Sequence, residues 1–188
     1  ASELSAAYNR IGQQKRAVQM LEGARKRLPD DEDLAFRLAA TYEQARKYDQ
    51  AERAFREIIR GNAKHAEALN YLGYMLAERS QKLPEAVELI KRALAEDADN
   101  PSFLDSLGWA YFKLGQFDNA RSPLERAASA MPKASVIHEH LGDLYVQMKR
   151  YADAVAAFER ALAGDRDGID AQALSRKRDH VRSLAGKS

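Results

Sequence analysis

A few short stretches contain residues that could bind a metal ion or catalyse a reaction. His138 and His140 flank Glu139, but residues two apart on a helix point about 200° from each other, so the two imidazoles cannot hold one metal ion together. We interpret both histidines as exposed polar residues of a helix. The stretch GDRDGID at 164–170 has the residue types of a calcium loop, but Arg176 stands where that loop needs a glutamate. We therefore interpret it as a turn that leads into a helix.

The end of the chain, AGKS at 185–188, has the last residue types of a phosphate-binding loop. Val181 stands where such a loop needs its first glycine, and the sequence predicts no strand before it. The other carboxylates and basic groups are spread along the chain and do not converge. The sequence therefore predicts no catalytic residue, no metal site and no cofactor, and so a protein that is not an enzyme.

The composition excludes several other classes of protein. Of 188 residues, 45% are hydrophobic and 31% charged, a balance typical of a folded, helix-rich chain. The absence of cysteine excludes disulfides and thiol catalysis. With a net charge of only +2, we interpret the basic runs at 25–27 and 175–182 as solvated helix faces and expect no nucleic-acid partner. No apolar run reaches the roughly 18 residues of a membrane span, so we expect no direct membrane insertion by this segment.

The elements that carry these residues recur along the chain. A buried-type alanine returns every 34 or 35 residues, at Ala17, Ala51, Ala86, Ala120 and Ala154. A large, mostly aromatic residue returns in the same phase, at Tyr8, Tyr42, Leu76, Tyr111 and Tyr145. Such a period is the signature of an array of stacked structural repeats.

The fourth unit shows what each repeat contains. Apolar or small residues at positions i, i+3, i+4 and i+7 mark one face of a first helix, at Leu104, Leu107, Gly108 and Tyr111. A second helix carries the series Ala120, Leu124 and Ala127, and Gly115 is expected to end the first helix. Small residues at Gly73, Gly108 and Gly142 are expected to let the two helices of a hairpin approach closely.

The spacing resembles the tetratricopeptide repeat (TPR) family, whose pattern is W-x2-L-G-x2-Y, then A-x3-F, then P. The fourth unit follows it from Leu107-Gly108 to Pro132, although Leu104 replaces the tryptophan. The resemblance implies an all-α solenoid, a right-handed superhelix of helical hairpins. The expected repeats are 1–31, 32–65, 66–100, 101–134 and 135–168. Residues 169–188 are expected to form a capping helix and tail, with Ile169, Ala173, Val181 and Leu184 on its apolar side and Arg176, Lys177, Arg178 and Arg182 outward.

The resemblance also implies a binding face. In TPR proteins the first helix of each hairpin lines a concave groove that holds a protein or peptide partner. The matching positions give our expected partner-binding residues: Phe36, Asn70, Tyr74, Asp105, Trp109, Phe112, Glu139 and Asp143. They predict a groove with an aromatic middle and an acidic C-terminal side, suited to basic groups or to backbone N–H donors. Trp109 either contacts the ligand or fills the space between neighbouring first helices. The acidic residues disfavour a clamp for a partner's terminal carboxylate.

A narrower resemblance concerns the run from ALNYLGYMLAERSQ to LDSLGWAYFKLGQFDNA, residues 68–120. It is similar to the C-terminal part of long bacterial TPR proteins, some of which are outer-membrane lipoproteins. One kind is an adaptor that brings substrates to a carboxy-terminal processing protease. This similarity implies a bacterial, periplasmic or outer-membrane-associated protein, with a cytoplasmic location as the alternative. Because the chain begins at Ala1 without a methionine, we expect it to be cut from a longer protein.

The predicted function is thus a protein-interaction scaffold or adaptor that binds its partner non-covalently. Two alternatives stay open at this stage. The array could assemble with itself into a homo-oligomer through the apolar ends of its hairpins. It could also be the regulatory segment of a larger protein.

Overall fold

The computed structural model describes residues 13–186, and within them all regular structure is helical. The helices are α2 (Gln14–Arg27), α3 (Glu32–Gln44), α4 (Tyr48–Gly61), α5 (Ala66–Glu78), α6 (Leu83–Glu96), α7 (Pro101–Lys113), α8 (Phe117–Ala130), α9 (Ser135–Gln147), α10 (Tyr151–Ala163) and α11 (Ala171–Ala185). The expectations for Tyr8, for the first helix of the 1–31 unit and for Lys187 and Ser188 of the AGKS motif lie outside the described residues.

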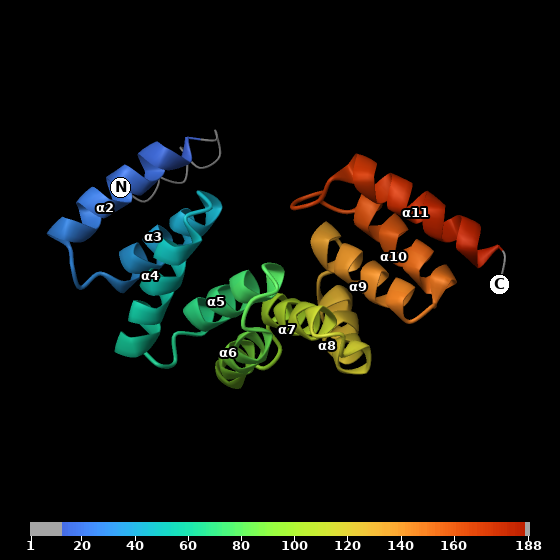
Figure 1. Ribbon diagram of the computed structural model, residues 1–188, viewed down its shortest axis with the longest axis horizontal. Helices are drawn as coiled ribbons and strands as arrows, with labels where there is room; N and C mark the ends of the chain where they lie inside the picture. The colour runs from blue at the N-terminus through green and yellow to red at the C-terminus, as the bar shows by residue number, and fades with distance from the viewer. Residues whose placement is uncertain (1–12, 187–188) are drawn as a thin grey trace.

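The helices form an arch of stacked hairpins. In Figure 1 the chain runs from α2 on one side, through α5 to α8 at the base, to α11 on the other side. Helices α5, α7 and α9 lie on its inner side, and α6, α8 and α10 lie on its outer side. The inner helices contact one another, since α5 packs on α7 and α7 on α9. The inner helices therefore form one continuous concave surface.

Local signals set where the helices begin and end. The side chains of Asp31 and Asn100 accept hydrogen bonds from free backbone N–H groups at the starts of α3 and α7. Gly115 follows α7 with φ +73°, and the next residue, Gln116, donates its N–H to the carbonyl of Tyr111 at 2.9 Å. This is the left-handed helix end that glycine favours. Arg46 and Lys149 take the same conformation after α3 and α9, so the turn recurs even without glycine.

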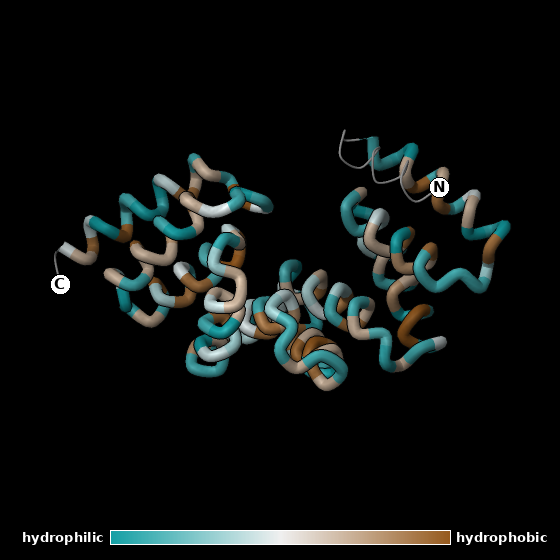
Figure 2. The backbone as a smooth tube through the Cα atoms, turned by 180° about the vertical axis from the view of Figure 1, so that it is seen from behind, coloured by the Kyte–Doolittle hydropathy of each residue, from teal (hydrophilic) through white to brown (hydrophobic). Residues whose placement is uncertain are grey.

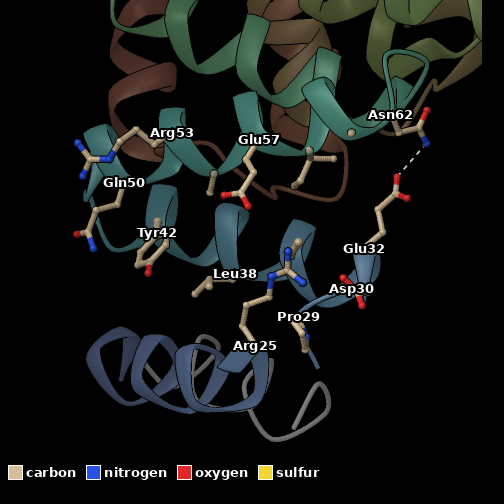
Figure 3. Close-up of a pocket in the computed structure, with 14 residues that line it drawn as sticks. Arg25, Pro29, Asp30, Glu32, Leu38, Tyr42, Gln50, Arg53, Glu57 and Asn62 are labelled. Atoms are coloured by element: carbon tan, nitrogen blue, oxygen red, sulfur yellow. Dashed lines mark hydrogen bonds between the residues drawn. The ribbon is translucent and has the colours of Figure 1, made fainter. Parts of the chain in front are cut away.

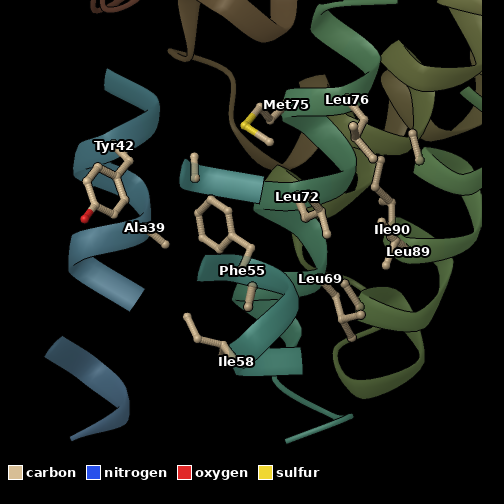
Figure 4. Close-up of a cluster of buried hydrophobic side chains, with 14 of the residues drawn as sticks. Ala39, Tyr42, Phe55, Ile58, Leu69, Leu72, Met75, Leu76, Leu89 and Ile90 are labelled. Carbon is tan, nitrogen blue, oxygen red and sulfur yellow. The ribbon is translucent and has the colours of Figure 1, made fainter. Parts of the chain in front are cut away.

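The core consists of the columns that the sequence repeats. The alanine of each second helix has no exposed surface, and neither do the large residues four positions later, Leu21, Phe55, Ile90, Leu124 and Phe158. Figure 4 shows the arrangement around Phe55, with Ala39 of α3 on one side and Leu72 of α5 on the other. Figure 2 shows polar and apolar residues mixed along the helices. In the described part of the chain no helix is both long and apolar enough to cross a membrane.

The repeated glycines are sites of close helix contact, as the sequence predicts. A Cβ atom added at Gly73 would lie 2.6 Å from Cγ1 of Ile90 and 2.9 Å from the backbone carbonyl oxygen of Ala86, both on α6. Added Cβ atoms at Gly108 and Gly142 would collide with Leu124 and Phe158. Glycine in these first helices therefore allows the second helix of the same hairpin to pack against the backbone.

The C-terminal helix α11 packs along α10 and covers the last hairpin. Its buried residues are Leu174 and Val181, while Ala173, expected on the apolar side, is exposed. The expectation for Lys177 was also wrong. Its ammonium group reaches back to Asp143 and Glu139 of α9, at 2.6 and 3.3 Å, because the two carboxylates attract it across the helix interface.

Candidate binding surface

The inner face of the arch contains a pocket of about 600 Å³, here called the inner pocket. Its walls come from α5, from the first halves of α7 and α9, and from the loops between α8 and α9 and between α10 and α11. The apolar part of the wall includes Tyr71, Tyr74, Phe103, Met131, Val136 and Ile137. The polar part includes Glu67, Asn70, Asn100, Asp105, Asp165 and Asp167. The pocket therefore combines aromatic and aliphatic surface with several oxygen acceptors.

Three of the expected partner-binding residues meet in the inner pocket, namely Asn70, Tyr74 and Asp105. Asn70 and Tyr74 lie one turn apart on α5, and Asp105 lies on the neighbouring helix α7. The approach of α5 to α7 brings them together, since corresponding faces of adjacent hairpins stack in register. The sequence pattern thus identified part of one wall.

Asn70 differs from the other polar residues of this wall. Its side chain is only 7% exposed, and its Oδ1 atom has no hydrogen-bond partner among residues 13–186. A buried amide oxygen without a partner loses its hydration and gains nothing in return. The wall of the inner pocket thus holds a buried acceptor without a donor among the described residues, which a ligand N–H group could satisfy if the Asn70 side chain turned toward the cavity.

Asp105 is held by a histidine from the next hairpin. Nδ1 of His140 lies 2.9 Å from Oδ1 of Asp105, and both side chains are buried. Burial of the imidazole works against its charged form, but the charge and hydrogen bond of Asp105, with the charges of Asp143 and Glu78, raise the pKa of His140 above its ordinary value. The buried hydrogen bond between the two side chains therefore joins α7 to α9.

The interpretation of the two histidines as exposed residues was wrong. His140 is 6% exposed, and His138 is also buried, with Nε2 3.1 Å from the carbonyl oxygen of Pro132. Burial lowers the pKa of His138, so its shift has the opposite direction to that of His140. A buried imidazole needs a hydrogen-bond partner. The partner of His138 is the carbonyl of Pro132, in the preceding loop, and that of His140 is Asp105, on the preceding hairpin. Neither contact can be read from the local sequence.

Trp109 is packed against other side chains of the protein. Its ring stacks on His140 at 4.0 Å and on Phe112 at 4.8 Å between ring centres, and Nε1 donates to Glu78 at 2.6 Å. Only 8% of the residue is exposed. Of the two alternatives for Trp109, the structure shows space filling between first helices. The ring covers the imidazole that holds Asp105, and so it positions the pocket wall indirectly.

Tyr74 presents a protonated phenol to the inner pocket. Burial, with the charges of Glu78, Asp105 and Glu43, raises the pKa of Tyr74 well above its ordinary value. The hydroxyl group can therefore donate a hydrogen bond at any physiological pH.

The remaining expected residues lie outside the inner pocket. Phe36 of α3 stacks on His65 at 5.4 Å and meets the edge of Tyr71 at 5.3 Å between ring centres. Phe112 packs between Trp109 and Phe117. Glu139 and Asp143 are both bridged by Lys177, so the acidic side predicted for the groove is partly neutralised by α11.

The sequence did not reveal the part of the pocket that comes from loops. Asp165 accepts the backbone N–H groups of Ser135 and Asp167, each at 3.1 Å, and so ties the α10–α11 loop to the start of α9. These hydrogen bonds lower the pKa of the Asp165 carboxyl group, which therefore stays ionised. The acidic spacing in GDRDGID was visible, but only the fold places it against α5 and α7.

A second pocket of about 550 Å³ lies between α2, α3 and α4. In Figure 3, Arg25 of α2 extends into it from below and Glu57 of α4 from above, with Tyr42 and Leu38 of α3 at the left between their levels. Its lining mixes basic residues with acidic ones and favours neither sign of charge. Residues 13–186 contain no group of three or more acidic, histidine or cysteine side chains arranged to hold a metal ion.

Comparison with known proteins supplies the relatives of this chain. A family model described as a tetratricopeptide repeat matches residues 36–101, and a second model with the same description matches residues 111–177. A TPR repeat-containing protein of Pseudomonas aeruginosa is 34% identical over 137 residues, which cover 73% of this chain and 23% of that protein. The chain spans less than a quarter of the length of each of the curated relatives it matches.

Solved structures share the fold at low identity. A thermophilic TPR protein of Thermus thermophilus superposes with a TM-score of 0.79 at 21% identity, covering 95% of both chains. PilW, described as a widely conserved type IV pilus biogenesis factor, superposes with a TM-score of 0.82 at 23% identity, covering 98% of this chain and 85% of its own. At these identities the likeness concerns the fold.

Proposed function

Because the chain belongs to the tetratricopeptide repeat family, we propose that it is a protein-interaction scaffold whose inner pocket holds a segment of a partner protein or peptide. The observation that carries this proposal is Asn70, a buried amide on the pocket wall whose oxygen has no partner within the described residues. Members of this family are generally non-catalytic, and the role we propose is likewise binding without catalysis. An extended peptide offers the N–H donors that such a wall lacks.

The expected partner-binding residues divide into two groups under this proposal. Asn70, Tyr74 and Asp105 touch the partner in the inner pocket. Phe36, Phe112, Glu139 and Asp143 contact parts of the partner that extend beyond the pocket along the inner face, and Trp109 positions Asp105 through His140. The division of the chain into five repeats and a C-terminal cap is also our proposal, and the helix pairs from α3–α4 to α9–α10 support it.

The wider role belongs to a longer protein. Since the chain matches less than a quarter of the length of its curated relatives, it is proposed as the recognition part of a larger adaptor. The resemblance to adaptors of a carboxy-terminal processing protease, and the periplasmic location that it implies, stay predictions.

Two equivalent residues give a sharp test of the inner pocket. Met131 and Leu28 each follow a second helix, with nearly the same backbone angles (φ −124°, ψ 72° and φ −128°, ψ 71°), and they are 37% and 56% exposed. Only Met131 lines the inner pocket. Met131→Arg should therefore block the pocket, whereas Leu28→Arg changes an equivalent surface site outside it.

The experiment immobilises the parent chain and both variants, exposes them to a bacterial extract and identifies the retained proteins by mass spectrometry. We expect a partner that the parent and Leu28→Arg retain and Met131→Arg loses. Equal retention by both variants would place the binding surface elsewhere. A molar mass that rises with concentration in light scattering, and is lowered by Met131→Arg, would instead favour self-assembly.

A further inference from the structure

The charges around the inner pocket have a single sign. Glu67, Asp105, Asp165 and Asp167 line it, and among the described residues no lysine, arginine or histidine does. Asp105 is paired with His140 at 2.9 Å, and Glu67 lies 3.4 Å from Nδ1 of His65. In the described part of the chain Asp165 and Asp167 have no ion-pair partner. The pocket thus retains negative charge after its internal pairs are counted.

Asn70 adds an independent acceptor to this charge. Its amide is more than nine-tenths buried in the pocket wall, and within residues 13–186 its Oδ1 lacks a hydrogen-bond donor. A ligand N–H group would satisfy this atom once the Asn70 amide turns toward the pocket, and the same ligand would meet the carboxylates. Oxygen acceptors of this kind match the several N–H donors of a guanidinium or ammonium group.

The rest of the wall suits the hydrocarbon part of a long basic side chain. Tyr71, Phe103, Met131 and Ile137 present aromatic and aliphatic surface beside the acceptors. Arginine and lysine bury their methylene groups against such surface while the charged end stays with polar partners. An acidic side chain would meet repulsion here, and a purely apolar one would leave Asn70 unpaired.

We propose that the inner pocket selects a basic residue, arginine or lysine, flanked by apolar residues in an extended segment of the partner. This inference rests on the proposed binding function and names the chemistry of its ligand. Neutralising the acidic wall should therefore weaken binding of a basic peptide and leave a neutral one unaffected.

The test begins with a phage-displayed library of random twelve-residue peptides, selected on the parent chain. We expect the selected peptides to be enriched in arginine or lysine next to apolar residues. The strongest peptide that contains arginine is synthesised with a fluorescent label, and a twin carries citrulline, the neutral isostere of arginine, in its place. Fluorescence polarisation should give the citrulline peptide an affinity about tenfold lower, the size expected for one charge-assisted hydrogen bond.

Matched variants locate the effect. Glu67→Gln with Asp167→Asn removes two carboxylates from the pocket, whereas Asp49→Asn with Asp118→Asn removes two from the first turns of α4 and α8, outside the pocket. Both pairs change the net charge equally. We expect the pocket pair to weaken binding of the basic peptide roughly tenfold and to leave the citrulline peptide unchanged, and the outer pair to change neither.

The outcomes separate this inference from the function on which it rests. Selected peptides without basic enrichment, or equal binding of the citrulline twin, would overturn the basic specificity while peptide binding stands. A selection that yields no peptide, or only peptides that Met131→Arg binds as well as the parent does, would overturn both. Self-association that Met131→Arg removes would make a second copy of the chain the occupant, against both proposals.

Discussion

Asn70 shows how one residue can trade stability for binding. Its amide is buried, with no partner for Oδ1 in the described part of the chain, an arrangement that costs about 1–3 kcal/mol when nothing compensates it. A leucine has a similar size and carries no polar group. We expect Asn70→Leu to raise the free energy of unfolding by about 1 kcal/mol, measured by urea denaturation, and to weaken binding of the selected peptide. A large loss of stability would show instead that the amide serves the fold.

The contact between His140 and Asp105 leads to a second prediction at the scale of residues. The pKa of His140 is raised by its neighbours and that of His138 is lowered by burial, so the two imidazoles should titrate on opposite sides of the ordinary histidine value near 6.5. Nuclear magnetic resonance with ¹⁵N-labelled histidine, assigned with the variants His138→Gln, His65→Gln and His180→Gln, measures both. If His140 titrated below about 6.5, burial would outweigh the carboxylates.

The same pair links stability to pH. Because the folded state raises the pKa of His140, its contribution to the free energy of unfolding is fully present below about pH 6.5 and is lost as the pH rises through the raised value. His138 acts in the opposite sense, since its contribution is lost as the pH falls through its lowered pKa. We expect urea denaturation of His138→Gln, which isolates His140, to show stability falling as the pH rises from about 6 to about 9.

At the scale of helices, the glycine column explains how each hairpin closes. Gly73 faces the backbone carbonyl of Ala86, which cannot move without moving α6. Gly73→Ala should therefore lower the free energy of unfolding by about 1–3 kcal/mol through overpacking, although alanine favours helix. Gly23 of α2 has nothing within 4 Å of an added Cβ, so Gly23→Ala should raise the same quantity by up to about 1 kcal/mol. Equal effects in urea denaturation would contradict this account.

Helix α11 has two roles, and its amphipathic pattern indicates only the first, which is to cap the stack. Leu174 and Val181 cover α10, as a terminal cap must. Lys177 also partly neutralises Glu139 and Asp143 on the inner helix α9 through ion pairs. Among the described residues, the carboxylates that line the inner pocket have no such lysine beside them.

At the scale of the whole molecule, the arch is a one-dimensional stack, and within residues 13–186 the main contacts of each hairpin are with its neighbours. Stability should therefore be lost locally when an end is weakened. Leu174→Ala removes a fully buried side chain and should cost about 2–5 kcal/mol. Amide hydrogen exchange should accelerate in α9 to α11 and stay unchanged in α3 and α4, while Leu28→Ala, at an exposed site, should change neither. Uniform acceleration would indicate a single cooperative unit.

The sequence by itself determined the hairpins, their core columns and the meaning of the glycines. These features depend on helix periodicity and on contacts within one repeat, such as Gly108 against Leu124, and they recur in each repeat. The resemblance to TPR repeats also led to Asn70, Tyr74 and Asp105 as expected residues of one inner face, and these three line the inner pocket.

Only the tertiary structure decided which polar groups are paired and where the pocket closes. His140 is hydrogen-bonded to Asp105, and Trp109 to Glu78. In each case the partner lies on the preceding hairpin, more than 30 residues away. Met131, Asp165 and Asp167 enter the inner pocket from loops whose local sequence indicates only turns. Such contacts depend on the rotation of one hairpin against the next, which sums many small packing interactions and is encoded in no single stretch of sequence.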